Sequence, residues 1–209
     1  MTEPGRPLPA LLSILLLATT SLAQETSAPA RNAESSDQEA LIRKGDTEWG
    51  LLAGFGLASN AGKGFGDRQF LPLGGRVGRV LTNRVGPGLL KGHFEISLDV
   101  IPLFLTVQDN VAYGFNVGLL FRHYMRLDAT MRPFVSFGSG PLVSTEQVPV
   151  GTSRFNFASS LGAGVLFRKS ERAAYMIEAR FHHISNADTA DTNPGINSIY
   201  FQFGISIFR

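Results

Sequence analysis

Apolar and polar residues alternate with a period of two over most of the chain after residue 46, and no window longer than ten residues keeps a helical stripe. In the run 111–124, large apolar side chains dominate one face and small or polar ones dominate the other. Side chains two residues apart share one face of a β-strand, so this pattern predicts strands with one apolar face. Eight runs are predicted to be strands: 47–58, 69–82, 89–105, 111–124, 132–144, 153–168, 172–187 and 197–208.

The length and number of these runs favour a barrel that crosses a membrane. A tilted spanning strand needs about 9–11 residues, and many of the runs reach ten. An even number of strands lets the sheet close with both chain ends on one side, and closure leaves no unpaired edge in lipid. We predict an all-β fold over 47–209, an eight-stranded antiparallel up-and-down transmembrane β-barrel in a Gram-negative outer membrane. A secreted sandwich or lipocalin-like barrel is the alternative.

Aromatic residues and chain direction predict how the barrel lies in the membrane. Trp49, Tyr113, Tyr124 and Tyr175 lie near the ends of the predicted strands, where interfacial aromatic side chains are expected. If both chain ends lie on the periplasmic side, the run 172–187 points outward. Its last residues are then expected at the depth of the outer leaflet.

The N-terminal region predicts export. Met1–Ala23 reads as a signal peptide, with Arg6 in a positive region, the short apolar core Leu8–Leu17, and the small-residue cleavage site Ser21-Leu22-Ala23. The polar segment 24–46 is predicted to be flexible. The chain has no Cys, so disulfides do not stabilise it, and its formal charge of +2 gives no reason to expect a nucleic-acid partner.

Candidate chemistry gathers on the last predicted hairpin. His183 and Ser185 are two residues apart on one strand, on the face that carries apolar side chains before them. Asn197 has the outward parity of the next strand, and the hairpin brings it close to both. Polar side chains that face hydrocarbon are costly unless they have a role. This pattern therefore predicts a site on the outer wall.

These residue types can perform acyl transfer to water. Ser185 would attack an ester carbonyl, and His183 would take its proton and return it to the leaving alkoxide. Asn197 would hold the imidazole tautomer. Asn186 and Asn193, or backbone N–H groups of the same loop, would hold the oxyanion or support the site. No cofactor is expected, and no metal, because the spacing of the four His residues resembles no zinc site.

Other polar residues are interpreted as structural. Glu178, Arg180 and His182 share the inward face of their strand and are expected in a polar network inside the barrel. Ser153, Ser159 and Ser160 have no His nearby in sequence, so we interpret them as packing residues.

At the hairpin the sequence resembles the outer-membrane lipid A 3-O-deacylases, the PagL-like acyloxyacyl hydrolases. The residues that carry the resemblance are Arg180, the pattern His183-x-Ser185-Asn186-Ala187 and the loop Asn193-Pro194-Gly195-Ile196-Asn197. The resemblance implies an eight-stranded barrel with its serine site on the outside. It implies hydrolysis of the ester-linked 3-hydroxyacyl chain at position 3 of lipid A, with lipopolysaccharide and outer-membrane lipid as partners. A homodimer is left open.

Two departures from the family pattern bear on activity. The family's third catalytic residue is Glu, and Asn197 stands at that position; the family commonly has Gly three residues after the serine, where this chain has Asp188. Asn cannot stabilise an imidazolium by charge, so a slower or inactive enzyme is expected. The alternatives to the esterase are a structural anchor or adhesin, an acyltransferase that uses the same serine, and a narrow channel, which is disfavoured because small barrels are filled.

Overall fold

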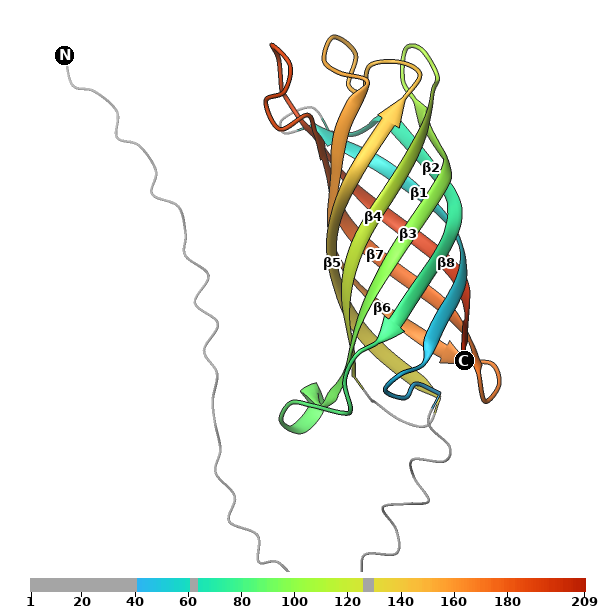
Figure 1. Ribbon diagram of the computed structural model, residues 1–209. Coiled ribbons are helices and arrows are strands. Elements are labelled where there is room, and N and C mark those ends of the chain that lie inside the picture. The colour runs from blue at the N-terminus through green and yellow to red at the C-terminus, as the bar shows by residue number, and fades with distance from the viewer. Residues whose placement is uncertain (1–40, 61–63, 126–129) are drawn as a thin grey trace, which may run out of the picture.

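The computed structural model describes residues 41–60, 64–125 and 130–209, which form a closed antiparallel barrel of eight strands in sequence order (Figure 1). Strand β1 pairs with both β2 and β8, so the ladder has no free edge. No helix among these residues is long and apolar enough to cross a membrane. The strands are β1 Thr47–Asn60, β2 Gly64–Val80, β3 Gly92–Val107, β4 Ala112–Met125, β5 Met131–Ser144, β6 Phe155–Arg168, β7 Ala173–Ser185 and β8 Ile196–Phe208.

The predicted fold is therefore confirmed, with every predicted run forming a strand. The largest difference is at β2, which begins at Gly64 rather than at residue 69. A short 3-10 helix, Gly88–Leu90, lies in the connection that precedes β3. The predicted signal peptide lies outside the described residues. Leu41 and Ile42, from the segment predicted to be flexible, are buried.

Alternation along the closed ladder places an apolar surface outside, and the inside holds buried polar and charged side chains together with buried apolar ones. The outer wall carries exposed large side chains from every strand, among them Leu51, Leu73, Phe137 and Phe203. An apolar outer band with a filled polar interior is typical of small membrane-spanning barrels. The outer face of β7 and β8 continues this band until it reaches the candidate site.

Tyr124 is a correction to the predicted interfacial aromatic residues. Trp49, Tyr113 and Tyr175 are exposed, but Tyr124 is buried inside the barrel. Its position follows from strand parity, because residues at even positions in β4 face inward. The ring packs edge-on against Phe134. An aromatic residue near a strand end is interfacial only if its parity points it outward.

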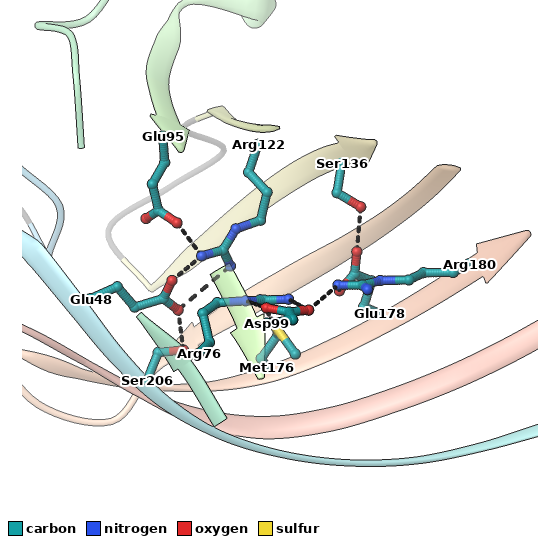
Figure 2. Close-up of polar contacts among 10 residues, drawn as sticks. All are labelled: Glu48, Arg76, Glu95, Asp99, Arg122, Ser136, Met176, Glu178, Arg180 and Ser206. Atoms are coloured by element: carbon teal, nitrogen blue, oxygen red, sulfur yellow. Dashed lines mark hydrogen bonds and ion pairs between the residues drawn. The ribbon is translucent and has the colours of Figure 1, made fainter. Parts of the chain in front are cut away.

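Two clusters of buried ion pairs lie inside the barrel (Figure 2). In the first, the guanidinium of Arg122 donates to the carboxylates of Glu48 and Glu95, and Ser206 donates to Glu48. These side chains come from four strands and are almost completely buried. Because each charge has a charged partner, the cluster offsets the cost of removing it from water.

The second cluster continues the network toward the end of β7. Arg76 and Arg180 both donate from Nη2 to Oδ2 of Asp99, at distances of 2.7 and 3.3 Å respectively. Arg180 also donates to Glu178, which accepts a further bond from Ser136 (Figure 2). The predicted inward network of Glu178 and Arg180 is thus confirmed.

His182 is the exception among the inward residues predicted to join this network. Its ring lies 4.4 Å from that of Tyr200 and 6.2 Å from that of Phe104, centroid to centroid. No hydrogen bond to either carboxylate of the second cluster is present among the described residues. An aromatic layer therefore lies inside the barrel between the ion pairs and the end that carries the candidate site.

Replacement of Arg122 with Met should destabilise the barrel by about 3–5 kcal/mol, because Glu48 and Glu95 would keep buried charges without their cation. Unfolding in urea, followed by loss of the fast-migrating folded band on a detergent gel, measures the effect. The control is Arg154→Met, since the Arg154–Glu146 pair is exposed and contributes about 0–1 kcal/mol. Equal effects of the two substitutions would contradict this account of the interior.

Candidate functional site

The outer ends of β7 and β8 place three polar side chains on the apolar outer wall. His183 and Ser185 are half-buried and Asn197 is exposed, whereas Ile184 and Ile196 beside them are buried. The hairpin that joins the two strands lies at the end of the barrel opposite the C-terminus (Figure 1). The three side chains therefore have the outward parity that the sequence predicts.

His183 and Asn197 are direct partners in the ladder between β7 and β8. The imidazole Nδ1 lies 2.7 Å from the side-chain oxygen Oδ1 of Asn197. An amide oxygen only accepts hydrogen bonds, so Nδ1 carries the proton and donates it. The lone pair is then on Nε2, which leaves that nitrogen able to accept a proton.

The loop after β7 lies against the edge of the imidazole that carries Cε1 and Nε2. A Cβ built on Gly195 would lie 2.8 Å from Cε1 of His183 and 3.4 Å from Nε2. Extending the β7–β8 register by one residue places Gly195 opposite Ser185. Among the described residues no hydrogen bond joins Ser185 to His183, as is common for catalytic pairs without bound substrate.

The predicted loop asparagines build the connection between the two strands. Asn186 is buried; its Nδ2 donates to the carbonyl of Thr192, and its Oδ1 accepts from the backbone N–H of Asp188. Asn193 accepts from the backbone N–H of Asn186 and donates from Nδ2 to Asp188. The backbone N–H and the side-chain amide of Asn186, and one N–H of the Asn193 side chain, therefore form hydrogen bonds that stabilise the loop.

Asp188 takes the backbone conformation that a glycine favours. Its φ is 59°, and the φ of Ala187 before it is 52°. Non-glycine residues enter this left-handed region at a cost, and Asp is among those that tolerate it best. The carboxylate offsets the cost by accepting the bond from Asn193. It is not bonded to His183 in the described residues, so it does not replace the missing Glu of the family pattern.

Two features of this surface were missed in the sequence. Ser159, interpreted there as a packing residue, is the ladder partner of His183 on the other side of β7. Its hydroxyl lies 2.8 Å from that of Ser139 on the outside of the barrel. Parity alone could have placed both serines outward, but only the register between β6 and β7 brings them beside His183. Gly195 was missed because its contact with His183 depends on the path of the loop.

Metal binding has no support from the geometry of the described residues. No group of three or more His, Asp or Glu side chains lies together in a way that would hold an ion. Among the described residues, the outer wall thus carries an imidazole with one unpartnered nitrogen and a hydroxyl two residues along the same strand face. This set suits nucleophilic attack on a carbonyl.

Comparison with known proteins points to one family. The model of the family described as lipid A 3-O-deacylase (PagL) matches residues 85–206, which is more than half of the chain. This stretch contains His183, Ser185 and Asn197. No curated protein sequence matches the chain.

Solved structures share the architecture at low sequence identity. The crystal structure of the outer membrane enzyme PagL is 19% identical, with a TM-score of 0.53, and the match covers 74% of this chain and 97% of that one. The crystal structure of Neisserial surface protein A is 10% identical, with a TM-score of 0.52, and covers 77% of this chain and 96% of that one. At these identities, the likeness concerns the fold.

Gly195→Ala should displace the imidazole of His183, because the new methyl group would meet Cε1 at 2.8 Å and the backbone has a φ of +63°. We expect the kcat of ester hydrolysis to fall about tenfold or more with little change in KM, since the ring orients the proton transfer rather than the substrate. The matched control is Gly151→Ala, where φ is +82° but no atom lies within 4 Å of the new Cβ. Equal losses in both variants would assign the effect to backbone strain instead.

Proposed function

Because the chain belongs to the PagL family of lipid A 3-O-deacylases, we propose that it removes the ester-linked 3-hydroxyacyl chain at position 3 of lipid A. It is an outer-membrane β-barrel, and the substrate of its family is a lipid of that membrane. The observation that carries the proposal is the position of His183, which is outside the barrel and bonded through Nδ1 to Asn197. This leaves Nε2 able to accept the proton of Ser185, which lies two residues along the same face of β7.

In the first half of the reaction, the Oγ of Ser185 attacks the ester carbonyl while Nε2 of His183 takes the hydroxyl proton. The tetrahedral intermediate collapses, the bond to the sugar oxygen breaks, and His183 returns the proton to that oxygen. The products are the sugar alcohol and an acyl-serine. In the second half, water loses a proton to His183 and attacks the acyl-serine; the bond to Oγ breaks, His183 gives that proton to Oγ, and the fatty acid and free Ser185 are released.

The loop after β7 is the source of N–H groups for the oxyanion. Asn193 uses one hydrogen of Nδ2 for Asp188, and its second hydrogen is available to an oxyanion next to Ser185. Asn186 has a supporting role, because it is buried and its amide holds the loop through Thr192 and Asp188. Backbone N–H groups of the loop would complete the hole.

The outward placement suits a substrate that stays in the membrane. An ester linkage of lipid A lies at the boundary between the sugar and the acyl chains, and an outer-wall site can meet it without removing the lipid from the leaflet. The neighbouring outward residue Phe181 is exposed and apolar, as acyl chains require. We infer that the site faces the outer leaflet.

Asn197 takes the place of the Glu that is the family's third catalytic residue, and it supports the imidazole less strongly. Its oxygen accepts from Nδ1 and so fixes the same tautomer that a carboxylate would fix. It contributes no negative charge when the imidazole becomes an imidazolium in the transition state. Orientation is preserved and electrostatic stabilisation is reduced, so a lower rate than that of a Glu-bearing relative is expected.

Ser185→Ala and His183→Ala should each abolish the release of 3-hydroxy fatty acid from lipid A. Mass spectrometry of lipid A from cells that express each protein measures this loss. The control is Ser170→Ala in the exposed turn between β6 and β7. Faster migration of unboiled than of boiled protein on a detergent gel verifies that each variant still forms a closed barrel. Unchanged lipid A with the wild-type protein would indicate an anchor, and lipid A carrying an extra acyl chain would indicate an acyltransferase.

Asn197→Glu should raise kcat, because a carboxylate in place of the amide that now lies 2.7 Å from Nδ1 would stabilise the imidazolium as well as orient it. A gain of about tenfold corresponds to about 1.4 kcal/mol of transition-state stabilisation. Asn197→Asp is the companion variant, with the same charge on a shorter side chain. A fall in kcat in the Glu variant would mean that the outer wall has adapted to a neutral third residue.

A further inference from the structure

The candidate site continues as a polar row across four neighbouring strands. Register pairs join Ser139 to Ser159, Ser159 to His183 and His183 to Asn197, from β5 to β8. All four side chains lie on the outer face. On β4 the row ends at the exposed, apolar Leu119, which pairs with Ser139.

Apolar side chains border the serine half of this row on both sides. The row toward the periplasmic end consists of Phe137, Leu161, Phe181 and Ile199, which are consecutive register partners. The row toward the loops holds Pro141 and Phe157, followed by Ser185. The two serine hydroxyls thus lie within the apolar band and not at its boundary with water. Polar groups within such a band need a hydrogen-bond partner other than water.

The serine pair has unused hydrogen-bonding capacity that faces the lipid. The two oxygens lie 2.8 Å apart, so one hydroxyl donates to the other. This bond uses one of two donors and one of four lone pairs. Among the described residues it is the only side-chain bond that either hydroxyl makes. One O–H and several lone pairs remain for a ligand.

The chemistry of the row favours a neutral hydroxyl over a phosphate. It contains no Lys or Arg, and an anion placed there would lack a counter-charge in an apolar setting. A hydroxyl is both donor and acceptor, and so it matches what a serine pair offers. A hydroxyl group on a lipid is therefore the class of ligand that fits this row.

We propose that Ser139 and Ser159 form a subsite for the 3-hydroxyl of the acyl chain that Ser185 attacks, and that this subsite selects hydroxylated chains. The inference rests on the proposed deacylase function. Ser159 is the diagonal ladder neighbour of Ser185, because their strand partners are His183 and Phe157 respectively. Diagonal neighbours are roughly 7–8 Å apart. An acyl chain can span this distance when its carbonyl carbon contacts Ser185 and the hydroxyl on its third carbon contacts Ser159.

Selectivity between two esters tests the subsite. Purified full-length protein in detergent micelles is given p-nitrophenyl 3-hydroxydecanoate or p-nitrophenyl decanoate, which differ only in the hydroxyl. The wild type should prefer the hydroxylated ester by about threefold to tenfold in kcat/KM, the range of one neutral hydrogen bond. In the Ser139→Ala/Ser159→Ala double variant this ratio should approach one, through a loss on the hydroxylated ester alone. Ser170→Ala should keep the wild-type ratio.

A binding measurement separates this inference from the deacylase proposal. Ser185→Ala protein, which lacks the nucleophile, is titrated calorimetrically with 3-hydroxydecanoic acid and with decanoic acid. Selective binding that disappears in the triple variant with both serines replaced would support the subsite even if no ester were hydrolysed. Hydrolysis by the wild type with an unchanged ratio in the double variant would overturn the subsite and leave the deacylase standing.

Discussion

The closed hydrogen-bond ladder is the constraint on which the rest of this structure depends. Once β8 pairs with β1, every residue of every strand has a fixed facing direction, because a slip of one residue would exchange the two faces of the strand. The charged residues of the two ion-pair clusters lie at inward positions, where they find partners, while Arg79 near the end of β2 is exposed. A polar outward residue is then an exception with a definite location, and His183, Ser185 and Asn197 are such exceptions.

The two polar regions of the barrel are satisfied in different ways. Inside, Arg122 bridges Glu48 and Glu95, Arg180 bridges Asp99 and Glu178, and Arg76 forms two bonds to Asp99, so each buried charge has a partner of opposite charge. On the outer wall, the pair His183–Asn197 leaves Nε2 of the imidazole without a partner in the part of the chain that the structure describes. Groups that satisfy one another stabilise the fold, whereas groups with remaining capacity can act on something else. This contrast, rather than polarity alone, distinguishes the candidate site from the interior network.

The period of the sequence was sufficient to predict strand number, closure and the outward parity of the candidate triad, because all three depend on local alternation. It was not sufficient for contacts between strands that are set by register. Ser159 looked like a packing residue until the pairing of β6 with β7 placed it beside His183. Tyr124 was expected at an interface because its place near a strand end was weighed above its parity. The contact between Gly195 and His183 depends on loop geometry, which alternation does not encode.

The neutral third residue has a physical consequence for a site in this location. A Glu at position 197 would be a carboxylate on an exposed outer-wall position, and a charge that faces hydrocarbon carries a desolvation cost unless it lies at the interface or is paired. Asn197 avoids that cost in the resting enzyme while it still fixes the tautomer of His183. In the proposed reaction the cost would reappear in the transition state, because the imidazolium would form without a counter-charge. Asn at position 197 would thus lower the cost of the folded ground state and raise the reaction barrier.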